Sequence, residues 1–162
     1  MPDISKTESA YLAGLWDGEG SITLWKNIRK ETGNPRLIAS LVFINTNLKM
    51  IEWVEDKLAK INATFHRYVI RYDGKQKDCY QQTARNREAV ERTIRTILPY
   101  LVAKKKQAEI VLSFVLSRKE QLRKSNGKPS SSCPYTDKEF AMETEIRKLN
   151  KLGKSESPET KH

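Results

Sequence analysis

The chain has 162 residues, and 30 lysines and arginines against 20 aspartates and glutamates give it a formal net charge of +10. One domain is the expectation at this length, and a hydrophobic content of 38% argues against a wholly disordered chain. No apolar run is long enough for a membrane helix, the N-terminus lacks a signal-peptide pattern, and two cysteines without metal-ligand spacing argue against a disulfide scaffold and a zinc finger.

The charge balance indicates a polyanion as the first partner to consider, although charge alone does not separate DNA from RNA or from an acidic membrane surface. The few cysteines favour a reducing intracellular compartment. A prokaryotic cytoplasm and the interior of an organelle fit this expectation equally well.

Capping residues, apolar spacing and turn residues predict the elements in chain order. Ser5 with Glu8, and later Thr136 with Glu139, have the form of capping boxes that open helices. Glycines are expected to end the first helix, and a glycine at position 74 to turn a hairpin. The predicted elements are helix 6–17, strand 21–28, strand 37–46, a helix capped by Asn47, strands 64–72 and 78–84, and helices 87–98, 103–124 and 136–149.

This order, α-β-β-α-β-β-α followed by further helices, predicts an α+β domain. Two antiparallel hairpins would form a sheet with helices on one face and the other face bare. The core is expected to span residues 1–124, followed by a loop at 125–135, a C-terminal helix at 136–152 and a disordered tail at 153–162.

The segment from residue 11 to residue 20 carries the most informative chemistry. Asp17 and Glu19 stand where a helix runs out among glycines, in a stretch without lysine or arginine. Negative charge at a helix C-terminus opposes the helix dipole, so a divalent cation would compensate it. An acidic cap or loop without metal is the alternative, and spacing alone does not choose between the two carboxylates.

The same helix carries small residues that suit a close helix–helix contact. Ala10 and Gly14 lie one turn apart, with Ala13 beside them. Because one chain supplies only one such helix, the partner would be a second copy across a two-fold axis. That contact would bring two Glu19 carboxylates together, as two-metal phosphodiester hydrolysis requires.

Residues 12–20, LAGLWDGEG, resemble the signature of the LAGLIDADG homing endonucleases. Trp16 stands in place of isoleucine, and Gly18-Glu19 in place of Ala-Asp. The element order resembles the family core through about residue 116, which implies a saddle-like antiparallel sheet. Residues 99–108, PYLVAKKKQA, resemble the family segment that enters its long helix, and a single motif implies the homodimeric branch.

The resemblance also implies roles for individual residues. Glu19 would bind the catalytic metal with the Gly18 carbonyl, and Asp17 would cap and pack the motif helix. Lys104 matches the basic residue near the scissile phosphate, for which a solvated lysine run is the alternative.

Two further positions bear on the active site. Asn47 stands where the family places a polar group near a metal-bound water, and its alternative role is a helix cap. Ile51 departs from relatives that carry arginine there.

The predicted sheet is expected to read DNA in the major groove, with alternate side chains toward the bases. Exposed sheet polarity and a frayed basic helix end are the alternatives for these positions. The predicted DNA contacts are Thr23, Trp25, Asn27, Arg29, Ser40, Thr46, Arg67, Arg71, Gln81, Thr83 and Lys106, with Asn150, Lys151 and Lys154 on backbone phosphates.

The resemblance implies a homodimeric, Mg²⁺-dependent homing endonuclease, encoded in an intron, that breaks both strands of a long pseudo-palindromic DNA site. Ca²⁺ or Mn²⁺ would substitute in the metal site, and no membrane partner is expected. The alternatives are an RNA maturase with intron RNA as its partner, a DNA-binding protein that does not cleave, and a basic RNA-binding protein whose motif match is accidental.

Overall fold

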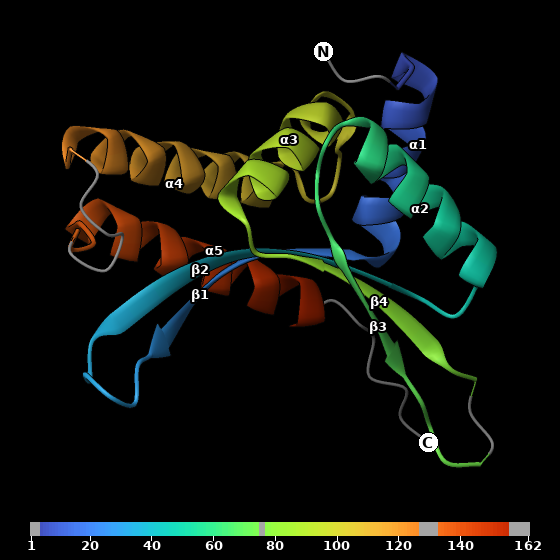
Figure 1. Ribbon diagram of the computed structural model, residues 1–162, viewed down its shortest axis with the longest axis horizontal. Coiled ribbons are helices and arrows are strands. Elements are labelled where there is room, and N and C mark those ends of the chain that lie inside the picture. The colour runs from blue at the N-terminus through green and yellow to red at the C-terminus, as the bar shows by residue number, and fades with distance from the viewer. Residues whose placement is uncertain (1–3, 75–76, 127–132, 156–162) are drawn as a thin grey trace.

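The computed structural model describes residues 4–74, 77–126 and 133–155, with the side chains of 152–155 outside the description. No helix in these ranges is long and apolar enough to cross a membrane. The elements are α1 (Lys6–Glu19), β1 (Gly20–Ile28), β2 (Pro35–Asn45), α2 (Leu48–Lys60), β3 (His66–Ile70), β4 (Cys79–Ala84), α3 (Arg87–Ile97), the 3-10 turn η1 (Leu98–Tyr100), α4 (Lys105–Lys124) and α5 (Asp137–Ser155) (Figure 1).

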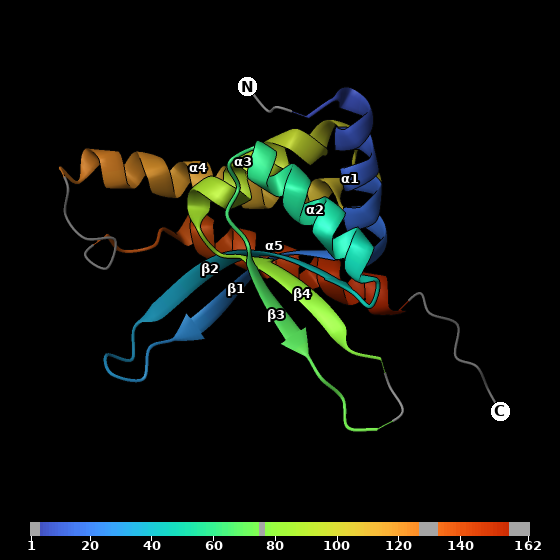
Figure 2. The same ribbon diagram turned by 45° about the vertical axis from the view of Figure 1, so that its right-hand side comes forward.

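The strands form one antiparallel sheet in the order β1-β2-β4-β3. Helices α1 to α4 lie over one face, and the two hairpins extend away from them as two arms (Figures 1 and 2). Helix α5 packs against β1, an edge strand, and against α4. The predicted α+β fold is therefore confirmed, with helices α1 to α4 all on the same side of the sheet.

The core lies between the sheet and α1 to α4. Trp16 of α1 is fully buried, stacks on Phe43 at 5.5 Å between ring centroids, and meets Phe65 edge-on at 5.9 Å. Alternate residues of β1 and β2, such as the paired Ile22 and Leu41, complete this apolar layer. Burial of large aromatic surface is a main source of folding free energy, so the motif helix is anchored through Trp16.

Helix α1 ends later than expected, because Gly18 and Glu19 continue the helix and Gly20 ends it. The Gly20 N–H bonds to the Trp16 carbonyl, and a Cβ on Gly20 would lie 2.5 Å from Trp16 Cδ1. The glycine is therefore required by the close approach of the Trp16 ring. Its φ of −84° is accessible to any residue.

Other boundaries also shift by a few residues. Strand β3 is shorter than expected, and α4 begins after residue 104. Helix α5 passes through Gly153 to Ser155, so the predicted tail is wrong for residues 153–155, because a single glycine weakens a helix without ending it. Residues 156–162 lie outside the described chain.

The predicted caps and turn are confirmed. Ser5 Oγ accepts from the Glu8 N–H at 3.2 Å and the Glu8 carboxylate accepts from the Ser5 N–H at 2.7 Å. Thr136 and Glu139 form the same reciprocal pair at 3.2 and 2.9 Å. Gly74 has a φ of 101°, as a glycine turn requires.

A buried ion pair fastens α5 to α4. The Arg118 guanidinium and the Glu139 carboxylate are both fully buried and lie 3.5 Å apart. Arg118 also donates to the carbonyls of Cys133 and Pro134, at 3.0 and 3.2 Å, and lies 4.4 Å over the Tyr135 ring. These contacts fix the start of α5, and thereby the path of its basic C-terminal half along β1.

Candidate functional site

The end of α1 is tied to the segment before α4. The Asp17 carboxylate accepts hydrogen bonds from the backbone N–H groups of Val102, at 2.7 Å, and Lys104, at 2.9 Å. These residues are more than 80 positions apart in the sequence. Both Asp17 oxygens are engaged by the chain's own backbone, so this carboxylate holds the motif helix in place.

Lys104 closes the same junction from the other side. Its ammonium donates to the carbonyls of Trp16, at 2.8 Å, and Asp17, at 2.6 Å, where positive charge complements the helix dipole. Burial lowers the pKa of Lys104, while nearby Asp17 acts in the opposite direction. The solvated-run alternative is therefore wrong for Lys104, whose side chain caps the motif helix.

Glu19 and Gly18 are exposed at this end of α1, directly after the residues that Asp17 and Lys104 hold. A carboxylate and a main-chain carbonyl are hard oxygen donors of the kind that Mg²⁺ and Ca²⁺ prefer. Within the described residues no group of three acidic, histidine or cysteine side chains could hold a metal ion. One chain thus offers a fitting but incomplete donor set.

The exposed face of α1 carries small residues at helical spacing. Ala10, Gly14 and Gly18 are exposed, and a Cβ on either glycine would meet nothing within 4 Å. Tyr11, 52% exposed, borders this face and contacts Trp53 of α2 edge-on. Ala13 is fully buried in the core, so its predicted place in a dimer interface is wrong.

Asn47 occupies the N-cap of α2. Its side-chain oxygen accepts from the Met50 N–H at 3.3 Å, and its own N–H donates to the Asn45 side chain at 2.8 Å. The cap alternative is therefore confirmed. Ile51, one turn later, is fully buried in the core, which accounts for an apolar residue at that position.

The strand register defines which side chains lie on the sheet face opposite α1 to α4, here called the open face. Residues that pair directly across two strands point to the same side of the sheet. Leu41 and Phe43 of β2 are buried, so they and their partners on β1 and β4 face the core, and the alternate residues face the other way. The open face carries Ser21, Thr23, Trp25, Asn27, Arg36, Ile38, Ser40, Val42, Ile44, His66, Tyr68, Ile70, Cys79, Gln81 and Thr83.

The predicted DNA contact of Arg67 is wrong. Arg67 pairs with the fully buried Gln82, so it points toward the helices, and its guanidinium binds the Glu55 carboxylate of α2. The Arg67 hydrogen bond is the main cause that lowers the pKa of Glu55. The longer strand predicted from the sequence places Arg71 on the same face as Arg67, but β3 ends at Ile70 and Arg71 lies exposed beyond it.

Two other predicted base contacts are withdrawn from solvent. Ser40 and Thr83 lie on the open face but are only 3% and 4% exposed. Ser40 pairs with Thr23, whose hydroxyl donates to the Ser40 carbonyl, and Thr83 lines a hollow of about 120 Å³ with His66, Tyr68 and Arg85. Neither side chain is placed to meet a base directly.

The remaining predicted contacts have varied surroundings. Thr23, Trp25, Asn27 and Gln81 lie on the open face, Arg29 follows β1, and Thr46 is exposed after β2. Lys106 forms an ion pair with Glu145 at 3.0 Å. Their DNA contacts stay predictions.

Arg85 is not among the DNA contacts predicted from the sequence, although it lies at the open face. Its guanidinium lies over the Trp25 ring at 6.0 Å, two residues beyond Thr83 and on the same face. The alternation through residues 81 and 83 was the signal that could have found it.

The basic end of α5 lies beside β1. A hollow of about 240 Å³ is lined by Thr23, Leu24 and Trp25 from the strand and by Glu143, Ile146, Arg147, Asn150 and Lys151 from the helix. Asn150 and Lys151 therefore stand next to the open face, as phosphate contacts would require. The Lys154 side chain lies outside the described part of the chain.

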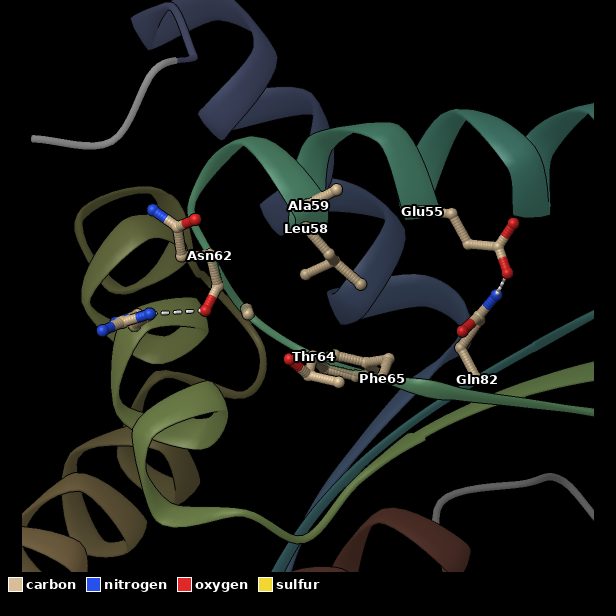
Figure 3. Close-up of a pocket in the computed structure, with 9 residues that line it drawn as sticks. Glu55, Leu58, Ala59, Asn62, Thr64, Phe65 and Gln82 are labelled. Carbon is tan, nitrogen blue, oxygen red and sulfur yellow. Dashed lines mark hydrogen bonds between the residues drawn. The ribbon is translucent and has the colours of Figure 1, made fainter.

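A larger pocket of about 600 Å³ opens on the helix side of the sheet (Figure 3). It is lined by Leu58 and Phe65 among others, and Arg92 at its edge donates to the Asn62 carbonyl at 2.6 Å. Gln82 donates to Glu55, while its side-chain oxygen has no hydrogen-bond partner among the described residues. This pocket is separated from the open face by the sheet.

The arrangement has the fold of DNA-binding homing endonucleases. Solved structures similar to the chain include I-CvuI with an I-CreI target in 2 mM Mg (18% identity, 97% of this chain, 87% of that chain, TM-score 0.58). Archaeal intron-encoded I-Vdi141I with DNA has 14% identity (89% and 97% coverage, TM-score 0.54), and I-GzeII with its DNA target has 13% (93% and 49%, TM-score 0.56).

Residues 6–98, more than half of the chain, match the model of the LAGLIDADG-like domain. The chain therefore belongs to the LAGLIDADG family. No curated protein matches its sequence.

Proposed function

We propose that the chain is a site-specific homing endonuclease, active as a homodimer, that makes a metal-dependent double-strand break in DNA. The exposed Glu19 at the end of α1 carries the proposal. It lies beside a fixed junction and next to an exposed face of small residues, so a second copy packed on α1 would bring two Glu19 carboxylates together.

Chain length supports the homodimer. The chain spans 97% of I-Vdi141I but about half of I-GzeII, so one copy of this chain corresponds to one half of the longer protein. Two copies would supply two sheets, and each open face would read one half of a pseudo-palindromic site.

Glu19 and the Gly18 carbonyl would hold Mg²⁺, for which Ca²⁺ would substitute. A bound Mg²⁺ supplies charge stabilisation at a phosphate and a more acidic water. The Lys104 ammonium donates to the carbonyls of Trp16 and Asp17, and the Asp17 carboxylate accepts from the Lys104 backbone N–H. Glu19 therefore projects from a rigid junction. Lys104 is thereby a positioning residue, with its charge close to where a scissile phosphate would bind.

The sheet and the basic side chains around it would place the DNA. Arg36 and Arg85 at the open face and Lys151 on α5 supply positive charge beside the apolar strand residues. Binding through phosphates releases counterions, so the affinity should fall steeply with salt, by a log–log slope of about −0.9 per phosphate neutralised.

The test is cleavage of a duplex selected from a randomised pool. Wild-type protein selects a bound duplex in Ca²⁺, and transfer to Mg²⁺ should produce a double-strand break at one position. Glu19→Gln should retain binding and lose cutting by at least a hundredfold. Glu88→Gln, at an exposed carboxylate on α3, is the matched control and should cut normally.

Normal cutting by Glu19→Gln would refute the site assignment. Specific binding by the wild-type protein with no cutting in Mg²⁺, Mn²⁺ or Ca²⁺ would instead establish the non-cleaving DNA-binding alternative.

A further inference from the structure

The centre of the open face exposes few polar groups that could read bases. Strand β2 lies between β1 and β4, and its open-face side chains Ile38, Val42 and Ile44 are apolar. The one hydroxyl among them, Ser40, is 3% exposed. Thus the strand that would lie deepest in a groove has no accessible hydrogen-bonding side chain between residues 38 and 44.

The polar side chains next to β2 are engaged with the protein. The Thr23 hydroxyl donates to the Ser40 carbonyl at 3.2 Å, and one N–H of the Gln81 amide donates to the Thr83 hydroxyl at 2.9 Å. Exposed aromatic rings flank them: Trp25 is 36% exposed and Tyr68 is 54% exposed. Ile44, 37% exposed, pairs with Gln81, which in turn pairs with Tyr68.

The occupant that fits this surface is duplex DNA rather than an apolar protein face. The apolar side chains Ile38, Val42 and Ile44 of β2 are here called the apolar patch. Basic side chains border it, with Arg36 at the start of β2, Arg85 over Trp25 and Lys151 in the last turns of α5. Phosphates would meet these charges while base edges meet the patch. The only apolar group that a standard base pair displays in the major groove is the thymine C5-methyl.

We propose that Ile38, Val42 and Ile44 read thymine methyl groups, so that the half-site carries A·T pairs opposite β2. This rests on the proposed DNA-binding function and specifies its target. At Ile44 the assignment is sharpest. Its cross-strand neighbour Gln81 uses one amide N–H on Thr83, and within the described residues its other N–H and its amide oxygen stay available for adenine N7 and N6. Isoleucine on a thymine methyl and glutamine on an adenine together select A·T over G·C.

The test removes single methyl groups from DNA. A duplex selected in Ca²⁺ from the randomised pool should be enriched in thymine at the positions opposite β2. Replacing each of those thymines by uracil should weaken binding about fourfold, the effect expected for one buried methyl-sized group, whereas uracil elsewhere should have no effect.

Ile44→Ser removes every methyl group from this side chain and should abolish the thymine-over-uracil preference at one position. Leu116→Ser, at a leucine 38% exposed on α4, is the matched control and should keep the full preference. A selected site without thymine enrichment, an unchanged affinity on uracil substitution, or a preference that survives Ile44→Ser would each overturn the proposal.

The failure of the proposed function would look different. If the protein selects no duplex at all, the DNA-binding function itself is refuted. If Ile44→Asp instead disrupts self-association without affecting DNA binding, the patch is a contact between copies and the thymine assignment is refuted.

Discussion

Substitution of Gly20 by alanine probes the junction at which the motif helix ends. The added Cβ would lie 2.5 and 2.6 Å from the Trp16 ring and 2.8 Å from the Trp16 Cα. Since the last of these is backbone, a rotation of the ring alone does not relieve the contact. Overpacking of this kind costs about 1–3 kcal/mol, so Gly20→Ala should lower the free energy of unfolding by that amount.

The assay is urea unfolding at one fixed protein concentration, followed by circular dichroism and by the fluorescence of the three tryptophans, of which Trp16 is the fully buried one. Gly18→Ala is the control, because a Cβ there meets nothing within 4 Å and Gly18 lies within the helix. That change should raise the stability of the single chain by up to about 1 kcal/mol. Equal or higher stability of Gly20→Ala relative to the wild type would refute the steric argument.

Three further outcomes are expected. Gly14→Ala should stabilise the chain by up to about 1 kcal/mol but weaken self-association in sedimentation experiments, and unchanged association would remove α1 from the proposed dimer contact. Arg118→Met should cost about 3–5 kcal/mol in urea unfolding, because Glu139 is left buried without its partner, and a cost below 1 kcal/mol would contradict this. The hydrogen bond from Lys57 is the main cause that lowers the pKa of Glu8 to about 2. The ionised Glu8 carboxylate therefore contributes fully to stability above pH 4.5, and this contribution is lost as the pH falls toward 2. Glu8→Gln should flatten that part of the pH profile, and an unchanged profile would show that other groups carry it.

Features set by neighbouring residues were predictable from the sequence. The capping boxes at Ser5 and Thr136 and the hairpin turn at Gly74 depend on chemistry within four residues, and the structure contains all three. The element order follows from apolar periodicity, which is why the sequence alone predicts the fold class.

The side of a strand or helix on which a residue is buried was harder to predict, because it depends on partners distant in the sequence. Arg67 was expected on the DNA side, but the pairing of β3 with β4 turns it toward Glu55, and alternation alone does not say which parity faces the core. Ala13 and Gly14 differ in the same way, since one lies against the core and the other is exposed. Small size at both positions gave no signal for that difference.

The contacts around Lys104 depended on tertiary structure altogether. Nothing in residues 104–106 distinguishes one lysine from the next, yet Lys104 reaches the carbonyls of α1 while Lys106 pairs with Glu145. The resemblance to the family singled out Lys104, whereas the sequence pattern by itself left it as one cation in a run.

The internal neutralisation of Asp17 has a consequence for assembly. Backbone N–H groups and the nearby ammonium of Lys104 offset the Asp17 charge, so Glu19 is the carboxylate at this helix end left without such compensation. In the proposed homodimer two such charges would approach each other and repel, by an amount that grows as water is excluded between them. A cation between them would turn that repulsion into attraction, so ion uptake and subunit pairing would be thermodynamically coupled, each strengthening the other.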